Sequence, residues 1–402
     1  MTPEPARPWH LPALLAALAM LGPFSIDTYL PAFPAIGTSL NAGMVEVQQT
    51  LTVYLLAYAA MMLWQGAISD ALGRRPVILA HLGVYAFACL GCAIAGNIES
   101  LLLFRVMQGM SAGAGIVVGR AIIRDRYHGP EAQKLMSRVT MLFAIAPAVA
   151  PVLGGWLLVF TGWRAIFYAL LALTLGLLAW CWRELPETLP PSRRQSLHPR
   201  ALLRNYIEVG KSGRFLLFSG IIAVNFAGFF IYIPAAPVFL IEHLGVTASG
   251  FAWLFLPSIA GIVAGAIISG RVAGRLSPRH TIETGYALMV AATLANLLLC
   301  WLRPPELPWN VMPLFVYTCG MSLVMPSVSL LLLDLFPAMR GLVSSLQGFV
   351  QVALSGIVAG VVSPYLAHSV LALAWGMAAF LAVGLALWAS YRLLEHSQSP
   401  SA

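Results

Sequence analysis

Apolar and polar positions alternate along the 402-residue chain in long blocks, with apolar runs of about 20 residues separated by short polar connections. A helix needs about 20 apolar residues to cross the hydrocarbon core of a bilayer, so each run is predicted to be one membrane-spanning helix. The runs fall near residues 11–31, 47–68, 76–96, 100–123, 135–159, 163–182, 214–240, 248–270, 280–302, 309–334, 342–365 and 369–393. The pattern predicts an all-α transmembrane protein with twelve spans. Because the connections within each half are short, consecutive spans should be antiparallel neighbours.

The only long polar segment, residues 183–213, divides these spans into two sets of six. It predicts three parts, namely an N-terminal half at 1–182, a linker at 183–213 and a C-terminal half at 214–402. The linker is rich in arginine and proline, which suits a cytoplasmic connection with a short interfacial helix around 199–210. A solvated tether is the alternative for such a charge run.

Composition and charge agree with a membrane protein. The residues are 59% hydrophobic and only 9% charged, whereas soluble chains carry about 25% charged residues. The net charge of +8 would suggest nucleic acid in a soluble protein, but the basic residues lie at the ends of apolar runs, so we expect no nucleic-acid partner. Of 23 Lys and Arg, only Arg105 lies within a span and only Arg164 and Arg303 lie in outer loops. Because basic loops resist translocation, both termini are predicted to be cytoplasmic.

The connection between the second and third spans concentrates charge in a few residues. It carries Asp70, Arg74 and Arg75, and Gly66 and Gly73 flank these charges. Gly73 can adopt the left-handed dihedrals that end a helix. The corresponding connection of the second half, residues 270–280, repeats the leading glycine and the basic tail. Two copies of a six-span unit joined by a linker form the layout of a transporter whose halves rock about a central site.

Two charged residues lie well inside the predicted spans. Asp27 is the only acidic one, and an intramembrane carboxylate by default marks an ion or proton pathway. The alternative is a solvated or capping residue near the outer interface. Arg105 is the only basic one, and a charge at that depth needs a partner or a water-filled cavity. The alternative for Arg105 is a side chain that snorkels to the outer headgroups.

Several stretches of the chain carry signature motifs. Gly66–Arg75 reads G-x-I-x-D-x-x-G-R-R, Arg105–Gly109 reads R-x-x-Q-G, and Ala150–Gly155 reads A-P-x-x-G-G. Together with residues 25–34 and 120–125, these motifs resemble the major facilitator superfamily and, within it, the Bcr/CflA (bicyclomycin/chloramphenicol resistance) group of drug:proton antiporters. The resemblance covers essentially the whole chain. The antiporter signature begins with glycine where this chain has Ala150, which leaves room for an uptake symporter.

The resemblance implies the major facilitator fold, with two pseudo-symmetric six-helix halves, and it implies roles for charged residues. Asp27 would carry the proton, and Arg105 would tune proton binding by sensing the Asp27 charge directly or through Gln108. A charge cluster would act as a conformational latch between the halves, built from Gly66, Asp70, Gly73, Arg74, Arg75 and Asp125. The alternative for this cluster is surface stabilisation alone.

The resemblance also implies an antiporter helix and a substrate cavity. Pro147, Pro151, Gly154 and Gly155 would make a tight contact that seals the half against proton leakage, although a kinked packing helix is the simpler interpretation. Polar, aromatic and methionine side chains on the cavity-lining spans are the candidate substrate contacts, because they offer an adaptable surface for amphiphilic ligands. These candidates are Tyr29, Tyr54, Tyr58, Gln108, Met141, Asn225, Phe226, Phe229, Tyr232, Trp253, Tyr317, Met321, Gln347 and Gln351. The alternative for the aromatic ones is that they face lipid or core.

We therefore expect a proton-coupled antiporter of the bacterial inner membrane that exports amphiphilic small molecules by alternating access. The proton gradient would replace any cofactor or metal, and the protein would act as a monomer surrounded by lipid. The alternative is a proton-coupled uptake symporter for a metabolite such as a sugar or nucleoside. An enzyme is not expected, because the histidines among the spans form no cluster with a nucleophile or metal ligands. These histidines are His81, His243, His280 and His368.

Overall fold

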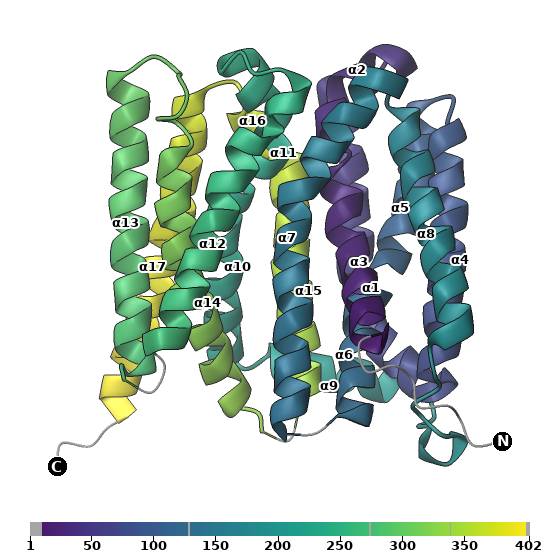
Figure 1. The fold of residues 1–402 in the computed structure, drawn as a ribbon. Coiled ribbons are helices and arrows are strands. Elements are labelled where there is room, and N and C mark those ends of the chain that lie inside the picture. The colour runs from purple at the N-terminus through teal and green to yellow at the C-terminus, as the bar shows by residue number, and fades with distance from the viewer. Residues whose placement is uncertain (1–9, 128, 273–274, 338, 399–402) are drawn as a thin grey trace. The chain divides into compact units, whose positions relative to one another are not determined.

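The computed structural model describes residues 10–127, 129–272, 275–337 and 339–398, and every element in these ranges is a helix. The chain forms two compact units, Met1–His198 and Pro199–Ala402. Each unit is a bundle of long helices (Figure 1). The predicted all-α class is therefore confirmed for the described residues.

The elements of the first unit are α1 (His10–Asp27), η1 (Leu30–Ala32), α2 (Phe33–Leu40), α3 (Met44–Leu72), α4 (Arg74–Ile94), α5 (Ile98–Ala112), α6 (Ala114–Arg126), α7 (Gly129–Thr161), α8 (Arg164–Glu184) and η2 (Pro191–Arg193). Those of the second unit are α9 (Pro199–Gly210), α10 (Gly213–Phe230), α11 (Tyr232–Ala236), η3 (Pro237–His243), η4 (Ala248–Phe251), α12 (Ala252–Val272), α13 (Pro278–Leu302), α14 (Met312–Asp334), α15 (Arg340–Ile357), η5 (Val358–Val362), α16 (Ser363–Leu366) and α17 (Val370–Gln398).

Among the described residues, 11 helical stretches are long and apolar enough to cross a membrane. Some join several elements, as in Leu11–Leu40, which combines α1, η1 and α2, and Ile98–Arg126, which combines α5 and α6. The first span therefore runs beyond the predicted end near residue 31. The remaining predicted span, near 135–159, falls on α7, a helix of 33 residues that contains the shorter apolar stretch Val149–Thr161.

Prolines interrupt the first span of each unit at corresponding places. Pro31 has no N–H to donate to the carbonyl of Asp27, four residues earlier, so α1 ends at Asp27 and the chain continues through η1 into α2. Pro234 stands four residues after Phe230, where α10 ends. The same break thus places a carboxylate at the end of the first helix in one unit and a phenyl ring in the other.

Glycines allow the helices of each unit to pack closely. In the first unit, a side chain at Gly109 of α5 would strike the backbone of Tyr54 in α3. In the second, a side chain at Gly261 of α12 would strike the backbone of Phe315 in α14. The bundles therefore depend on small residues at the points where their helices meet.

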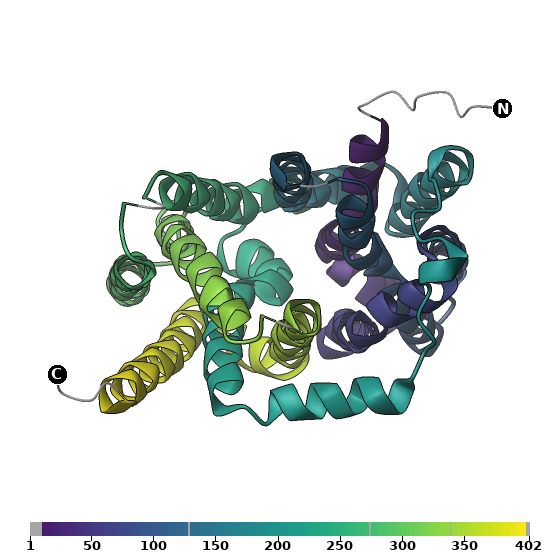
Figure 2. The same cartoon turned by 90° about the horizontal axis from the view of Figure 1, so that it is seen from below.

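Helix α9 differs in direction from the long helices. Figure 2 shows most helices nearly end-on, whereas α9 lies in the plane of the view. It packs against α10 and α15 and buries Val209, while Leu203 and Ile207 stay exposed. This confirms the helix predicted around 199–210, and an amphipathic helix of this kind suits the membrane interface.

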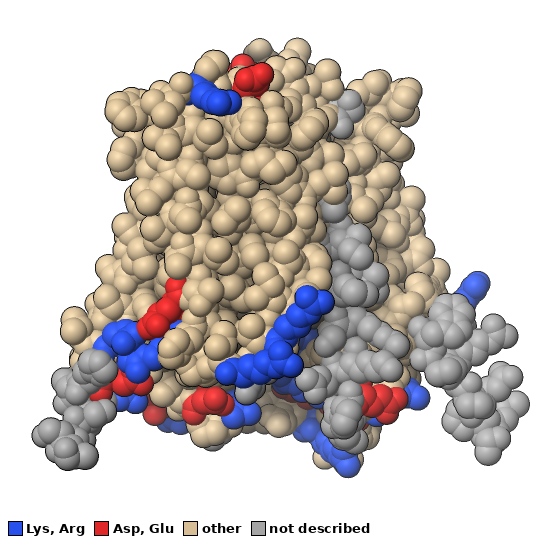
Figure 3. Space-filling view, turned by 60° about the vertical axis from the view of Figure 1, so that its left-hand side comes forward, with Lys and Arg blue, Asp and Glu red and all other residues tan. Residues whose placement is uncertain are grey.

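Charged side chains are unevenly distributed on the face that Figure 3 shows. They gather toward its lower and upper ends, and its middle is covered by uncharged side chains. A surface in contact with hydrocarbon requires this arrangement, because a charged side chain at the bilayer centre is costly.

Replacing Gly261 by alanine should destabilise the protein by about 1–3 kcal/mol, because the added methyl group overpacks the contact with α14. Alanine at Gly270, in the same helix α12, would meet no atom within 4 Å and should be neutral or slightly stabilising. Thermal unfolding of both variants in detergent checks this expectation. Equal melting temperatures would contradict the packing described for α12 and α14.

Candidate functional site

The charged side chain of Arg105 lies inside the first unit. It belongs to α5 and is 0% exposed. Its Nη1 donates hydrogen bonds to Gln108 Oε1 at 2.8 Å, to Ser25 Oγ at 3.2 Å and to the Ser25 carbonyl at 3.3 Å. Gln108 lies one turn further along α5, and Ser25 lies on α1. Arg105 therefore connects two helices by charge-assisted hydrogen bonds, and it does not extend to a headgroup region.

Two tyrosine rings enclose the Arg105 guanidinium. Its Cζ lies 4.6 Å from the ring centroid of Tyr29 and 4.3 Å from that of Tyr54. The Tyr29 hydroxyl is hydrogen-bonded to Thr50, and the Tyr54 hydroxyl donates to the Gly22 carbonyl at 3.3 Å. A desolvated cation–π contact contributes about 2 kcal/mol. The rings thus stabilise a buried charge where no carboxylate forms an ion pair with it among the described residues.

The structure explains why the R-x-x-Q-G motif specifies glutamine and glycine after the arginine. Gln108 accepts from Arg105 and donates from Nε2 to Cys89 Sγ at 3.0 Å, which fixes its amide between α4 and α5. Gly109 allows Tyr54 of α3 to come close enough for its ring to reach Arg105. Two further donors of Arg105, Nε and Nη2, are buried and form no hydrogen bond with the described residues. Buried donors of this kind need water or a ligand group as a partner.

Asp27 is the last residue of α1 and is only 5% exposed. The span continues through η1 and α2 to Leu40, so Asp27 lies within the span and the interpretation as a solvated cap at its outer end does not fit. Its carboxylate forms no hydrogen bond or ion pair with the described residues. Asp27 and Arg105 do not contact each other, and Ser25, two residues before Asp27, is the hydrogen-bonded neighbour of Arg105.

Helix α7 packs against the turn that follows Asp27. A side chain at Gly154 would strike the backbone of Thr28, the next residue after Asp27. Pro151 and Gly155 are also buried, and Pro147 is half-buried. The predicted antiporter helix is therefore in direct contact with the chain segment that carries the buried carboxylate.

The predicted latch residues of the first unit lie together at the junction of α3, α4 and α6. Arg74 Nη1 lies 2.5 Å from Asp70 Oδ1, and Arg74 Nε lies 3.1 Å from Asp125 Oδ2. Arg74 also donates to Ser69 Oγ at 2.7 Å. Its side chain is 8% exposed, so this arginine is a buried centre shared by two carboxylates. Gly66 lies within α3, where a side chain would only graze Val117.

The sequence did not indicate the part that the linker has in this cluster. Glu187, from the segment after α8, accepts hydrogen bonds from the backbone N–H groups of Arg74 and Arg75 at 3.1 and 3.3 Å. The carboxylate thereby caps the N-terminus of α4, where an anion is favoured by the helix dipole. Gly73 has φ of +106°, and a side chain there would lie 2.5 Å from Glu187 Oε2. Glycine at 73 is therefore required both by the backbone and by the cap.

Further contacts hold the start of the linker on the cluster. Thr188 donates to Asp125 Oδ2 at 2.9 Å, the Gln195 N–H donates to the Asp70 carbonyl at 3.0 Å, and Arg194 lies 3.9 Å from Glu187. Residues 185–189 are thus held on their own unit, so a solvated tether does not describe the start of the linker, whereas residues 190–198 are exposed and contact the unit only through Arg194 and Gln195.

The substrate-contact candidates fall into separate groups. In the first unit, Tyr29, Tyr54 and Gln108 surround Arg105, and the ring of Tyr58 stacks on Tyr54 with centroids 6.2 Å apart. The side chain of Met141 lies outside the described residues. This group was predicted as a list of cavity residues, and the structure brings most of it to one charged centre.

The candidates of the second unit are mostly engaged within it. The Asn225 side chain donates from Nδ2 to the Tyr286 hydroxyl at 2.9 Å, and its backbone carbonyl accepts from the Tyr317 hydroxyl at 3.0 Å. The Tyr232 hydroxyl accepts from Asn296 at 2.8 Å. Phe226 and Phe229 form a ring pair with centroids 6.3 Å apart, and Gln347 donates a hydrogen bond to Gln351 at 3.2 Å. Met321 is buried and Trp253 is exposed. Tyr286 and Asn296 were missed, because only their long-range partners identify them.

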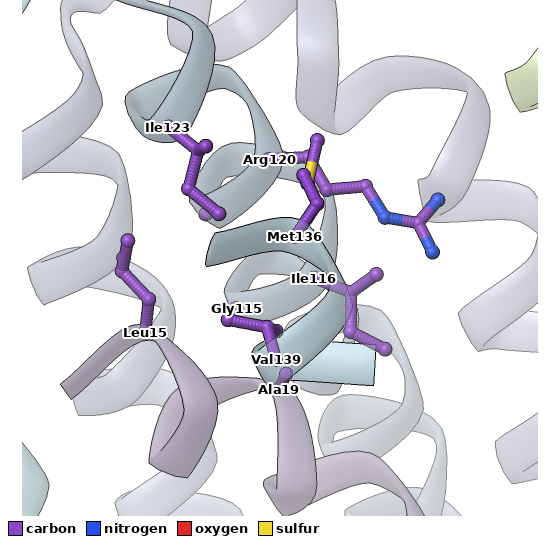
Figure 4. A pocket seen from close by; sticks show the side chains of 9 residues that line it. Leu15, Ala19, Gly115, Ile116, Arg120, Ile123, Met136 and Val139 are labelled. Atoms are coloured by element: carbon purple, nitrogen blue, oxygen red, sulfur yellow. The ribbon is translucent and has the colours of Figure 1, made fainter. Parts of the chain in front are cut away.

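A small cavity lies in the first unit between α1, α6 and α7 (Figure 4). Its volume is about 60 Å³, and most of the side chains that line it are apolar. Figure 4 shows the Arg120 guanidinium pointing away from Leu15 and Ile123. Drug-sized ligands occupy about 300–1,000 Å³, so this cavity is too small to hold one by itself.

The family profile described as Major Facilitator Superfamily matches residues 15–360 of the chain. The chain is 32% identical over 351 residues to the uncharacterized MFS-type transporter YdgK of Bacillus subtilis, which covers 87% of each chain. It is 28% identical to a bicyclomycin resistance protein homolog of Haemophilus influenzae, again over 87% of each chain. It is 32% identical to a chloramphenicol resistance protein of Pseudomonas aeruginosa, over 70% of this chain and 68% of that protein.

Solved structures share the fold at low sequence identity. The crystal structure of a bacterial homolog of the human lysosomal transporter Spinster, in an inward-facing and occupied conformation, matches with a TM-score of 0.73. The sequence identity is 19%, and the match covers 99% of this chain and 100% of that one. At this identity the likeness establishes the fold alone.

Glu187→Gln should loosen the linker segment, because the amide no longer places a negative charge at the N-terminus of α4. A lost helix cap costs about 1 kcal/mol, which corresponds to about fivefold more opening. Limited trypsin digestion at the linker arginines should therefore proceed about fivefold faster than in the wild-type protein. Glu208→Gln, an exposed change of the same charge on α9, is the control. Equal cleavage rates for both variants would contradict the capping role.

Proposed function

The chain belongs to the Major Facilitator Superfamily, and on this premise we propose that it exports amphiphilic, drug-like molecules across the bacterial inner membrane in exchange for protons. Relatives named for resistance to bicyclomycin and chloramphenicol support export over the uptake of a metabolite. The observation that carries the proton-coupled mechanism is Asp27, a carboxylate buried within a span and without a hydrogen-bond partner among the described residues.

The chain is a multi-pass protein of the inner membrane. Its proposed topology has twelve spans, in which α7 is the fifth, and both termini lie in the cytoplasm. The distribution of Lys and Arg supports this orientation, because nearly all of them lie in the connections assigned to the cytoplasm. The linker and helix α9 then lie at the cytoplasmic surface.

Asp27 binds and releases the transported proton in this mechanism. Burial without a partner makes the charged carboxylate costly, so the charged state must be satisfied by water or by a substrate group that enters the cavity. Arg105 provides a fixed positive charge near this segment. It is hydrogen-bonded to Ser25, which precedes Asp27 by two residues. Its unpaired Nε and Nη2 donors are available to water that connects the two charges.

Proton binding is coupled to helix movement through α7. Gly154 of α7 lies against the backbone of Thr28, the residue after Asp27. A shift of α7 relative to α1 would therefore change the position or surroundings of the Asp27 carboxylate. The helix break after Asp27 allows this segment to change its backbone conformation. Pro31 has no N–H, so the Asp27 carbonyl lacks its helical hydrogen bond. The contact also excludes water from the boundary between the two helices, which limits proton leakage.

The Asp70–Arg74–Asp125 cluster sets the resting state in this account. Alternating access requires a two-state element that both ligands bias. A buried arginine shared by two carboxylates, and covered by a capped linker, holds the cytoplasmic ends of α3, α4 and α6 in one arrangement. All of these groups belong to the first unit, so the proposed latch acts by holding the helices of this unit in place.

The substrate class follows from the residues around the charged centre. Tyr29, Tyr54 and Gln108 are buried around Arg105, and Tyr58, which stacks on Tyr54, is partly exposed. In the proposed cycle these side chains would offer an aromatic and amide surface once the helices around them separate. Such a surface suits amphiphilic molecules with an aromatic or aliphatic body and a polar group.

Asp27→Asn should abolish proton-driven accumulation of substrate in proteoliposomes, because an amide cannot bind and release a proton. Substrate exchange at equal pH on both sides should persist, since it needs no net proton movement. Glu99→Gln removes a carboxylate from the exposed first turn of α5 and should leave both activities unchanged. Undiminished proton-driven accumulation in Asp27→Asn would overturn the assignment.

Arg105→Lys should lower proton-driven export by about tenfold or more, a change that corresponds to about 1.4 kcal/mol. Lysine keeps the charge but lacks the planar group that lies between two rings and donates to Gln108 and Ser25. Arg271→Lys, at an exposed position at the end of α12, is the matched control. Wild-type export rates in Arg105→Lys, measured on folded protein, would show that the charge alone suffices.

A further inference from the structure

Arg120 is a charged residue of a membrane span that the proposed mechanism does not use. It lies on α6, about 9 Å before the end of the span Ile98–Arg126. Its side chain is exposed and forms no hydrogen bond or ion pair with the described residues. Hydrocarbon solvates a charged side chain poorly, so charges inside spans face water or a partner group. An unpaired charge at this depth therefore indicates water or a ligand beside it.

The surroundings of α6 place Arg120 on an inner face of the first unit. The helix packs against α1, α3, α4 and α7 of that unit. Figure 4 shows the Arg120 guanidinium pointing away from Leu15 of α1. Its charge acts on the hydroxyl of Tyr58 in α3, a side chain that is partly exposed. An exposed charge on a helix enclosed in this way faces water that enters the bundle, and not lipid.

The local charge favours an anion. Arg124, one turn further along α6, is also exposed and forms no ion pair with the described residues, and its charge repels that of Arg120. Asp125 of the same helix is already engaged by Arg74 and Thr188. Like charges four residues apart on a helix destabilise it. An anionic group at Arg120 would reduce this repulsion.

Apolar surface adjoins the charge. The cavity of Figure 4 is lined by Leu15, Ile116, Met136 and Val139 together with Arg120, which alone is charged among the described residues that line it. Its volume of about 60 Å³ holds a small apolar substituent but not a whole drug-sized molecule. An inorganic anion at Arg120 would leave this cavity unused. An amphiphile with an anionic group and an apolar part would contact both.

Aromatic rings connect Arg120 to the candidate transport site. Tyr58, on which the Arg120 charge acts, stacks on Tyr54 with ring centroids 6.2 Å apart. Tyr54 in turn lies 4.3 Å from the Arg105 guanidinium. An amphiphile bound at Arg120 would therefore have aromatic surface beside it on the side that leads to Arg105.

We propose that Arg120 binds an anionic group, such as a carboxylate, of the amphiphiles that this chain exports, and that it thereby favours acidic over uncharged substrates. A guanidinium suits this role, because its planar set of donors matches the two oxygens of a carboxylate. The inference rests on the proposed export function and narrows its substrate class. In the proposed topology Arg120 lies near the cytoplasmic end of its span, where an exported molecule would enter.

Equilibrium dialysis of a matched pair of probes tests this inference. Dansylglycine carries an aromatic body and a carboxylate, and its methyl ester lacks only the charge. Both are dialysed against the purified full-length protein in detergent, with protein-free micelles as the reference. The wild-type protein should bind the acid about tenfold more tightly than the ester, the factor that one charge-assisted hydrogen bond supplies. Equal affinity for the two probes, or binding of neither, would overturn the inference.

Substitutions on α6 assign the preference to one residue. Arg120→Gln should weaken binding of the acid about tenfold and change binding of the ester by less than about twofold. Arg126→Gln removes the same charge from the exposed last residue of α6 and should leave both affinities within about twofold of the wild type. Equal weakening in these two variants would show general electrostatic attraction and would contradict the role of Arg120.

Arg120→Lys keeps the charge and should still bind the acid more tightly than the ester. Gel filtration and thermal unfolding verify that each variant is folded, and Arg120→Lys with the wild type carries the test if Arg120→Gln does not fold. Loss of the preference for the acid in Arg120→Lys would show that the charge at this position does not produce it. The dialysis needs no proton gradient, so its result is independent of proton-driven accumulation in Asp27→Asn and the two proposals fail separately.

Discussion

Burial of one positive charge organises the N-terminal half of this transporter. Arg105 has no carboxylate partner among the described residues, so its charge is stabilised by two tyrosine rings and by oxygens of Ser25 and Gln108. Removing an ion from water costs several kcal/mol, and these contacts offset that cost only if α1, α3 and α5 hold their positions. Gly109 is needed because it permits the close approach of α3 to α5 at this site.

The two halves share an architecture but differ in chemistry. Both have a first span that prolines interrupt, with Asp27 at the break in one half and Phe230 in the other. The first half therefore holds buried charged residues such as Asp27 and Arg105, whereas the second holds buried polar residues such as Asn225 and Tyr317, which are joined by a hydrogen bond from the Tyr317 hydroxyl to the Asn225 backbone carbonyl. In the proposed exchange mechanism, this asymmetry places the proton site in one half and couples it to the relative movement of the two halves.

The amino-acid sequence alone predicted the helical class, the spans outside α7 and the two charges inside them, because hydrocarbon imposes length and polarity so strictly. It also predicted that Asp70 and Asp125 belong to one cluster with Arg74. Asp70 and Arg74 lie four residues apart in a single sequence motif. It could not predict that Tyr29 and Tyr54 enclose Arg105, or that Glu187 caps α4, because these contacts join residues that are far apart in the chain. The extent of the first span was also missed, since Pro31 ends α1 but the chain continues through η1 into α2.

The direction of proton movement is the most direct test of exchange. Proteoliposomes containing the wild-type protein and a pH-sensitive dye in the lumen are loaded with an amphiphilic antibiotic and diluted into medium without it. If the account is correct, outward movement of the antibiotic drives protons inward, and the lumen becomes more acidic. Alkalinisation of the lumen would show symport, and an unchanged lumenal pH during antibiotic efflux would show transport without protons. Either result would contradict the proposal that this chain is a drug:proton antiporter.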